Sequence, residues 1–468
     1  MYTFSKNIKV KKLSNNNILL LDTKVGAWCI TTKNDLSHIE IINSLLNSGK
    51  SAFEKSPYFS ILETLYSRGL VSKNEKFIYE NAHIDHSKNK VNTIILKVVG
   101  HCNLACSYCY DYNSVRYKLK MPFEKAKQAI DGVWGRSGDN LNILFHGGEP
   151  MLEKKLIFKI VEYVNQKRLL SNKRIKFSIQ TNGTQFDDEW VEHLLSNNYS
   201  IGVSLDGDEK INDINRYYHN KKGSFRKIIS TINSYPQLKE RVGILTTVTK
   251  TNVNNLFEIA KFFQELGFKT WKSILYQTAG RSIAFDDKLH PDSIEIVNSY
   301  LKLFEGIENG DFPKIKIASI SSYIENVLYY KRTNMCLRSN CGAGSDLVSI
   351  SVDGTIEACD CITNIDYRLG KLSSAESIST ALDSTVAQAI RSRNVESLFQ
   401  CSNCDWRKFC GGTCLAKAGR LDKVEPTECL LSLNLFEKIF ESLNKSNSLI
   451  DYVNTFSKGH YFQEDFVA

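Results

Sequence analysis

The sequence predicts an α/β fold: a parallel sheet with helices outside it, a small module in front and a cysteine-rich segment behind. Three observations lead to this prediction. Between about 91 and 285, apolar stretches alternate with amphipathic ones, as in a chain of βα units. Residues 1–90 contain short strand and helix patterns. Nine of the 13 cysteines lie between 336 and 430, where apolar periodicity is weak.

Composition narrows the class of protein. The 468 residues are 42% apolar and 24% charged, which is ordinary for a globular chain. No run of about 18 apolar residues predicts a membrane span, and the first residues lack a secretory signal. We therefore expect a cytoplasmic protein with neither a membrane nor a nucleic acid as partner. Residues 1–90 carry 13 Lys/Arg and 8 Asp/Glu, which fits an acidic peptide partner or simple solubility.

The first 90 residues predict a small winged-helix-like module that ends in a linker. Strands are expected at 8–12 and 18–21 around a turn of Ser and Asn, with a possible third strand at 27–30. Two amphipathic helices follow, and the second ends at Gly69. A module that only packs or dimerises is the alternative.

The middle segment predicts six parallel strands, at 93–99, 142–145, 176–179, 200–205, 242–247 and 270–275. Residues 286–335 are expected to form a helical bridge. In parallel α/β folds, ligands bind at the carboxyl ends of strands. The polar motifs of this segment follow the predicted strands, so we expect a site at that edge of the sheet.

Three cysteines follow the first predicted strand in the spacing C-x3-C-x2-C: Cys102, Cys106 and Cys109. Three thiolates can hold three irons of a cubane cluster and leave the fourth iron open for another ligand. A zinc site would need a fourth protein ligand, and His101 is poorly placed for that because it adjoins Cys102.

Eight further cysteines form a long pattern: Cys336, Cys341, Cys359, Cys401, Cys404, Cys410, Cys414 and Cys429. Eight thiols suffice for two cubane clusters or for a pair of zinc sites. Two cysteines lie outside these groups. Cys29 is expected to be a small buried residue, whereas Cys361 is a bystander, a ligand or a substrate contact.

The first cysteine motif, with Tyr108 before its last cysteine, resembles the signature of the radical S-adenosylmethionine (SAM) superfamily. The pattern from Cys341 through Gly354 to Cys429 resembles the SPASM extension of some members. The resemblance implies a partial (β/α)6 radical SAM barrel over 91–285, a SPASM domain over 336–430, and a C-terminal helix and tail over 431–468. It also implies that SAM binds the open iron and is cleaved to a 5′-deoxyadenosyl radical. The electron would come from a donor such as flavodoxin or ferredoxin.

The same resemblance assigns residues to SAM. Gly147, Gly148 and Glu149 match the glycine-rich motif that meets the methionine amino group. Gln180 and Asn182 would contact the ribose, and Ser204 the ribose or carboxylate. Arg216 would pair with the carboxylate, and Leu275 would border the adenine. A purely structural role is the alternative for each polar residue.

The resemblance to SPASM proteins implies three [4Fe–4S] clusters in all. Cys336, Cys341, Cys359 and Cys414 would hold the first auxiliary cluster, and Cys401, Cys404, Cys410 and Cys429 the second. Asp360 matches a residue that takes a proton from the substrate in anaerobic sulfatase-maturating enzymes. A turn-capping aspartate is the alternative.

The motifs at 145–150 and 340–344 look like those of maturases that act on ribosomally made peptides, including thioether-forming ones. The front module resembles the element with which such maturases hold a leader peptide. We therefore expect an oxidoreductase that installs a C–S or C–C crosslink in a short precursor peptide. The alternatives are a maturase of a full-length protein, such as a sulfatase (formylglycine formation) or an amine dehydrogenase, and a non-catalytic electron-transfer protein.

Overall fold

The computed structural model describes residues 2–47, 59–77, 90–329, 332 and 334–457. Its centre is a ten-stranded sheet in the order β12-β11-β10-β9-β8-β7-β6-β13-β14-β15. The run from β6 to β12 is parallel throughout. The predicted α/β class with a central parallel sheet is confirmed.

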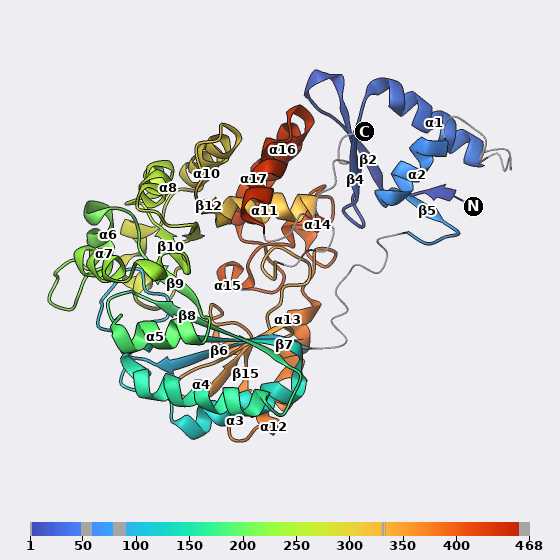
Figure 1. The fold of residues 1–468 in the computed structure, drawn as a ribbon. Coiled ribbons are helices and arrows are strands. Elements are labelled where there is room, and N and C mark those ends of the chain that lie inside the picture. Colours follow the sequence, from blue (N-terminus) through green and yellow to red (C-terminus); the bar gives the residue numbers. More distant parts are fainter. Residues whose placement is uncertain (1, 48–58, 78–89, 330–331, 333, 458–468) are drawn as a thin grey trace.

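All six predicted strands are present: β6 (Val91–Val99), β7 (Ser137–Gly147), β8 (Arg174–Thr181), β9 (Ser200–Ser204), β10 (Val242–Val248) and β11 (Thr270–Leu275). The helices between them are α3 (Phe123–Arg136), α4 (Lys154–Arg168), α5 (Asp188–Ser196), α6 (Glu209–Asn215), α7 (Phe225–Ser234) and α8 (Leu256–Glu265). They cover the outside of the curved sheet (Figure 1). Strand β6 is buried almost throughout, because neighbouring elements cover both of its faces.

The bridge over 286–335 is less uniformly helical than predicted. It contains α9 (Asp286–Leu289), α10 (Ser293–Glu308) and α11 (Ala318–Leu328), but also β12 (Lys316–Ile317). Strand β12 pairs in parallel with the start of β11. A two-residue strand carries too little periodicity to be recognised in a sequence.

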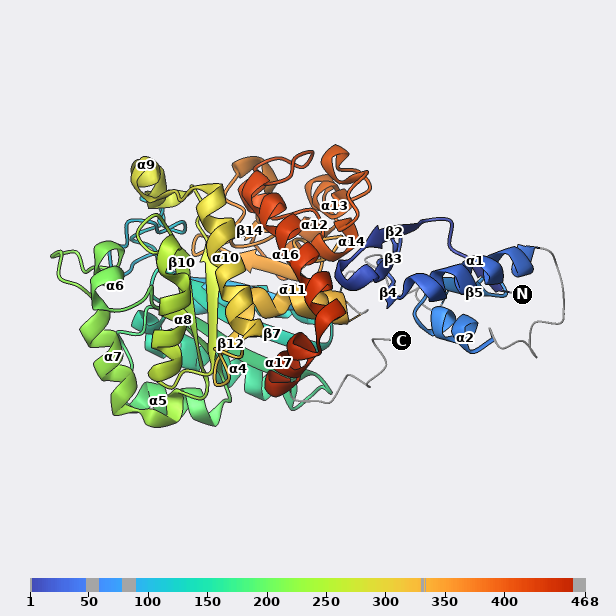
Figure 2. The ribbon, with the colours of Figure 1, turned by 90° about the horizontal axis from the view of Figure 1, so that it is seen from above.

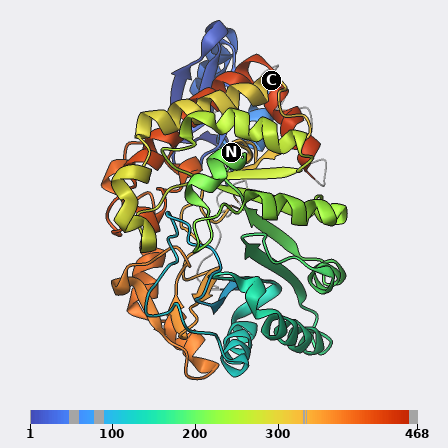
Figure 3. The same ribbon diagram turned by 90° about the vertical axis from the view of Figure 1, so that its left-hand side faces the viewer.

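The cysteine-rich segment is part of the central sheet, which its weak apolar periodicity did not predict. It contributes β13 (Leu347–Ile350), β14 (Thr355–Glu357) and β15 (Arg368–Lys371), and β13 pairs in parallel with β6. Its helices are α12 (Glu376–Leu382), α13 (Thr385–Ser392), α14 (Arg407–Cys410) and α15 (Leu415–Ala418). Val348 and Ile350 are fully buried, so the pairing is driven by apolar burial. In Figure 3 this orange segment lies on the opposite side from the green barrel helices.

The N-terminal module contains the three expected strands, β2 (Ile8–Lys12), β3 (Ile18–Asp22) and β4 (Trp28–Thr31), in one antiparallel sheet. Its helices are α1 (Lys33–Asn47) and α2 (Phe59–Ser67); a second small sheet joins β1 (Tyr2–Phe4) to β5 (Val71–Lys73). The expected linker at 74–90 lies largely outside the described residues.

One face of the β2–β3–β4 sheet packs inside the N-terminal module, and the opposite face packs against the rest of the chain. Trp28 packs edge-on against Phe440 at 5.2 Å, in α16 (Pro426–Lys445), and its Nε1 donates to the Val327 carbonyl at 2.9 Å. Helix α17 (Ser448–Phe456) follows α16. The module lies beside α16 and α14, at the far end from α6 and α7 (Figures 1 and 2). None of the helices in the described ranges has the length and apolar content of a membrane span.

Candidate active site

The three cysteines after β6 lie together in an apolar shell. Cys106 is buried and Cys102 and Cys109 are half-buried, packed with Leu104 and Tyr276. Burial raises the pKa of Cys109 to about 12 and raises that of Cys102 further. A free thiolate is therefore unfavourable here, whereas iron would supply the compensating positive charge. This donor set fits a cluster held by three thiolates.

Two glycines bring the end of β7 against this cysteine loop. Gly147 has φ +118°, a conformation that side chains disfavour. A Cβ on Gly148 would lie 2.1 Å from the His101 carbonyl oxygen, so no side chain fits there. The N–H of Glu149 donates to the same carbonyl at 2.9 Å. The glycine motif and the cluster loop are thus in direct backbone contact.

The Glu149 carboxylate ties the ends of β7 and β8 together. It accepts hydrogen bonds from the Thr181 hydroxyl at 2.6 Å, the Asn182 N–H at 2.7 Å and the Met151 N–H at 3.1 Å. The side chain is fully buried, and this burial raises its pKa to about 7. In this geometry Glu149 positions the loops, and its carboxylate is already engaged by the chain itself.

One of the predicted ribose contacts, Asn182, lies beside the first cysteine, Cys102. The Asn182 amide donates to Oδ1 of Asn103 at 2.8 Å and lies 3.7 Å from the Cys102 sulfur. The Gln180 amide donates to the Ser204 hydroxyl at 3.0 Å. Gln180 also lines a cavity of about 310 Å³ between β7 and β10. The structure therefore brings Gln180, Asn182 and Ser204 to one end of the strands.

Arg216 forms a buried chain of polar contacts next to the cluster loop. Its guanidinium donates to the Tyr108 hydroxyl at 2.8 Å, and that hydroxyl donates to Asp206 at 2.5 Å. The Nε of Arg216 is buried and makes no hydrogen bond within the described part of the chain. Leu275 lies elsewhere, on a cavity of about 110 Å³ that it shares with Gln277 and Lys417.

Burial raises the pKa of thiols in both predicted auxiliary sets, and neighbouring thiols add to the shift. Burial, then Cys341 and Cys361, raise the pKa of Cys336 to about 11. Burial, then Cys410, Cys404 and Cys429, raise the pKa of Cys401 to about 12. Burial, then Glu428, raise the pKa of the Cys414 thiol, and Cys361 and Cys341 add smaller increases.

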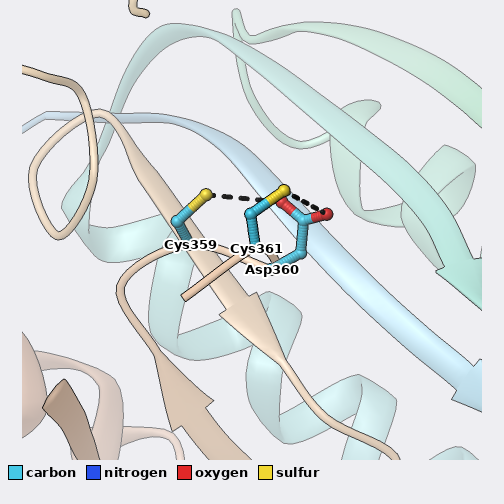
Figure 4. A group of neighbouring side chains, drawn as sticks. All are labelled: Cys359, Asp360 and Cys361. Atoms are coloured by element: carbon cyan, nitrogen blue, oxygen red, sulfur yellow. Dashed lines mark hydrogen bonds between the residues drawn. The ribbon is translucent and has the colours of Figure 1, made fainter. Parts of the chain in front are cut away.

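Cys359, Asp360 and Cys361 project from one turn after β14 (Figure 4). One ligand atom from each lies within 4.8 Å of the others. The Cys359 sulfur is 3.4 Å from Oδ1 of Asp360, and the Cys361 sulfur is 3.7 Å from Oδ2. This turn therefore offers two thiols and one carboxylate at a single place.

Three residues outside the predicted site, Lys97, Tyr110 and His146, lie around Asp360. The Tyr110 hydroxyl donates to Asp360 at 2.8 Å and lies 3.5 Å from Nε2 of His146. The Lys97 ammonium lies 2.6 Å from Oδ1 of Asp111 and 3.1 Å from the Asp360 carbonyl oxygen. The sequence could have indicated Lys97, because it stands in an apolar run of a predicted strand and a buried charge needs a partner.

The fold and these residues define a class of protein: an α/β protein whose three-cysteine loop, at the carboxyl ends of parallel strands, could hold an iron–sulfur cluster. The family model of the radical SAM superfamily matches residues 96–266. An uncharacterised protein of Methanocaldococcus jannaschii is 33% identical over 281 residues, 58% of this chain and 88% of its own. The chain belongs to the radical SAM superfamily, whose members use SAM and a [4Fe–4S] cluster.

Other similarities cover more of the chain at lower identity. A cysteine-type anaerobic sulfatase-maturating enzyme of Clostridium novyi is 26% identical over 335 residues, 69% of this chain and 87% of its own. The structure of anSMEcpe with bound AdoMet matches with a TM-score of 0.64 at 21% identity, covering 78% of this chain and 98% of its own. The structure of Streptococcus suis SuiB bound to precursor peptide SuiA matches with a TM-score of 0.55 at 15% identity, covering 92% of this chain and 100% of its own. The two structural similarities show the fold.

Proposed function

We propose that this enzyme is a peptide maturase that installs an intramolecular crosslink, C–S or C–C, in a ribosomally made precursor. The observation that carries the proposal is the position of the N-terminal module, which lies beside the cysteine set of Cys401, Cys404, Cys410 and Cys429. Lys9 and Lys11 of β2 both pair with Asp405, at 2.6 and 2.9 Å, and Asp405 directly follows Cys404. A peptide held by the module would therefore lie next to the cysteine-rich segment.

The N-terminal sheet offers one open edge to such a peptide. Hydrogen bonds at Asn7 and Leu13 fix the β2–β3 register, so the N–H and C=O of Val10 point away from β3. Val10 is 55% exposed, whereas Ile30 on the other edge strand is 1% exposed. We propose that the leader adds a strand along β2, a recurrent mode of peptide recognition. SuiB, which matches over most of this chain, was solved with its precursor peptide.

The proposed cofactors are SAM and three [4Fe–4S] clusters, held by Cys102, Cys106 and Cys109 and by the two auxiliary sets. When bound, the clusters supply the electron that cleaves SAM and accept the electron released as the new bond forms. SAM would lie at the strand ends, where Arg216, whose buried Nε makes no hydrogen bond with the described residues, would pair with its carboxylate. Gln180, Asn182 and Ser204 would contact the ribose, and Leu275, on the cavity that it shares with Gln277 and Lys417, would border the adenine.

A crosslink removes two hydrogens from the peptide. The deoxyadenosyl radical takes one as an atom, and the other leaves as a proton and an electron. We propose Asp360 as the base that receives this proton. His146, then Lys97 and the Tyr110 hydroxyl, hold the pKa of Asp360 below its usual range despite burial. Asp360 is therefore ionised and ready to accept a proton at neutral pH.

The test couples binding to product mass. Val10→Pro removes the outward N–H of β2, whereas Val10→Thr keeps it. With each short precursor encoded beside the gene, we expect the proline variant to lose at least about ten-fold in peptide affinity. Crosslinking, read as a loss of about two mass units, should fall with it while SAM cleavage continues. Equal affinities for both variants would contradict leader binding at β2.

Maturation of a full-length protein is the second candidate. The similarity to the Clostridium novyi sulfatase-maturating enzyme over 87% of that protein favours it, and so does the aspartate that directly follows Cys359. An unmodified sulfatase peptide incubated with enzyme and SAM discriminates the two. Formylglycine in that peptide, with no mass change in any neighbouring precursor, would establish the second candidate and reject the first.

A further inference from the structure

The radical SAM chemistry requires one electron from outside the chain, and one face of the molecule is built to receive its carrier. We propose that the segments 115–120 and 217–222 form a docking surface for an acidic one-electron carrier protein. We call this surface the basic face. The inference rests on the proposed function only in that a cluster is held by Cys102, Cys106 and Cys109; it does not depend on the substrate.

The basic face is in direct contact with a proposed cluster ligand. The Tyr117 hydroxyl donates to the Cys102 carbonyl at 3.2 Å, and Nε2 of His219 lies 3.0 Å from the same oxygen. The Tyr117 hydroxyl and Nε2 of His219 are 3.1 Å apart, so the two segments meet at this point. His219 is exposed, and His101, also exposed, packs its ring against Tyr117 at 5.1 Å. An exposed side chain is thus one hydrogen bond from the backbone of Cys102.

The charge of the basic face is of one sign. The two segments contain five Lys/Arg residues and no Asp/Glu. Arg116 turns inward to Glu357 at 3.0 Å, and Lys120 pairs with Glu153 at 2.6 Å. The other three, Lys118, Lys221 and Lys222, are exposed and form no ion pair with the residues that the structure describes. This positive charge is free to attract an acidic partner.

The basic face also carries exposed apolar and aromatic side chains. Val115 is 81% exposed and Leu119 is 39% exposed. The Lys221 ammonium lies 4.3 Å above the ring of Tyr217. Apolar centres ringed by charge are typical of protein interfaces, and redox encounters are among the small, transient ones. A nucleic acid would contact the lysines through its phosphates, but it would not bury the exposed apolar side chain of Val115.

The location separates this partner from the precursor peptide. The segment after β6 and the α6–α7 region lie on the left of Figures 1 and 2, and the N-terminal module lies at the right. A carrier on the basic face and a leader on β2 would therefore occupy opposite ends of the molecule. At this step one electron leaves the reduced carrier and enters the oxidised cluster, and no covalent bond forms or breaks.

The experiment compares two triple variants of the full enzyme with all clusters in place. Lys118→Glu/Lys221→Glu/Lys222→Glu reverses the charge of the basic face. The control, Arg168→Glu/Arg174→Glu/Lys176→Glu, reverses three exposed charges at the amino ends of the strands. Each protein is reduced either by a flavodoxin hydroquinone or by dithionite, which needs no docking surface. Cluster bleaching without SAM, flavodoxin affinity at low salt and SAM cleavage are recorded.

We expect the basic-face variant to bind flavodoxin at least about ten-fold more weakly and to be reduced by it correspondingly more slowly, with less dependence on salt. Its reduction by dithionite should equal that of wild type, and the control should match wild type with both reductants. Unchanged flavodoxin binding would overturn the proposal. Equal loss with dithionite would also overturn it, because the lysines would then act on the cluster itself. Lost precursor binding with normal flavodoxin reduction would assign the face to the peptide instead.

Discussion

The hydroxyl of Tyr110 lies 2.8 Å from Oδ2 of Asp360, although 250 positions separate the two residues in the chain. Tyr110 directly follows Cys109, and Asp360 directly follows Cys359. One hydrogen bond thus joins the loop that carries Cys102, Cys106 and Cys109 to the turn that carries Cys359 and Cys361. The contact places the proposed base at the boundary between the barrel and the cysteine-rich segment.

Replacing the base should separate SAM cleavage from product formation. Asp360→Asn keeps the size of the side chain but removes the proton acceptor, so crosslinking should fall by about 10²–10⁴. Tyr110→Phe should give a smaller decrease, and Tyr112→Phe, whose hydroxyl does not contact Asp360 among the described contacts, should give none. Mass spectrometry of peptide and 5′-deoxyadenosine measures both reactions. Crosslinking by Asp360→Asn at the wild-type rate would remove Asp360 from the mechanism.

A methyl group at Gly148 should disrupt the site, because a Cβ there meets the His101 backbone at 2.1 Å. We expect Gly148→Ala to cost about 1–3 kcal/mol of stability through overpacking and to abolish SAM binding. Gly135→Ala is the matched control: its Cβ would meet nothing within 4 Å, late in helix α3. That change should stabilise the protein by about 0.5–1 kcal/mol. Thermal unfolding and SAM titration check both variants, and wild-type SAM affinity in Gly148→Ala would contradict the assignment.

The iron content of cysteine variants should show how many clusters the protein binds. Replacing Cys102, Cys106 and Cys109 by Ala should remove about four irons and all SAM cleavage. Replacing the set of Cys401, Cys404, Cys410 and Cys429 should remove about four others and leave the first cluster spectroscopically intact. Cys361→Ala serves as the control with unchanged iron. Zinc in place of iron in the second set, in protein made anaerobically, would show that this set is structural.

His193 should make stability fall as the solution becomes acidic. Burial lowers its pKa to about 4, and its ring stacks on Phe158 at 3.7 Å. The folded state therefore favours the neutral ring, and this contribution is complete above the unfolded pKa of about 6.5 and is lost as pH falls towards 4. With solvent screening of this half-buried ring, the loss is about 1–2 kcal/mol. His193→Gln should reduce the difference between the free energies of unfolding at pH 7.5 and pH 5.5, as measured with denaturant. The exposed control variant His290→Gln should leave this difference unchanged.

The barrel was predictable because each of its strands is an apolar run long enough to stand out, as in 93–99 and 242–247. Strands β12 and β13 were not, since two or four residues carry no measurable period and their burial depends on β11 and β6. The same holds at the site. Spacing alone indicated Cys102, Cys106 and Cys109, but Lys97 and Tyr110 acquire their roles from contacts with Asp111 and Asp360.

The parallel pairing of β13 with β6 decides how this chain can be divided. If the chain ended before the cysteine-rich segment, β6 would become an edge strand. The backbone groups that now bond to Leu347–Ile350 would be exposed beside the apolar side chains of Ile94, Ile95 and Leu96. Such an edge recruits other chains and promotes aggregation. We therefore expect the barrel and the segment that follows it to fold as one cooperative unit, so that truncation within it gives an insoluble fragment in place of a smaller enzyme.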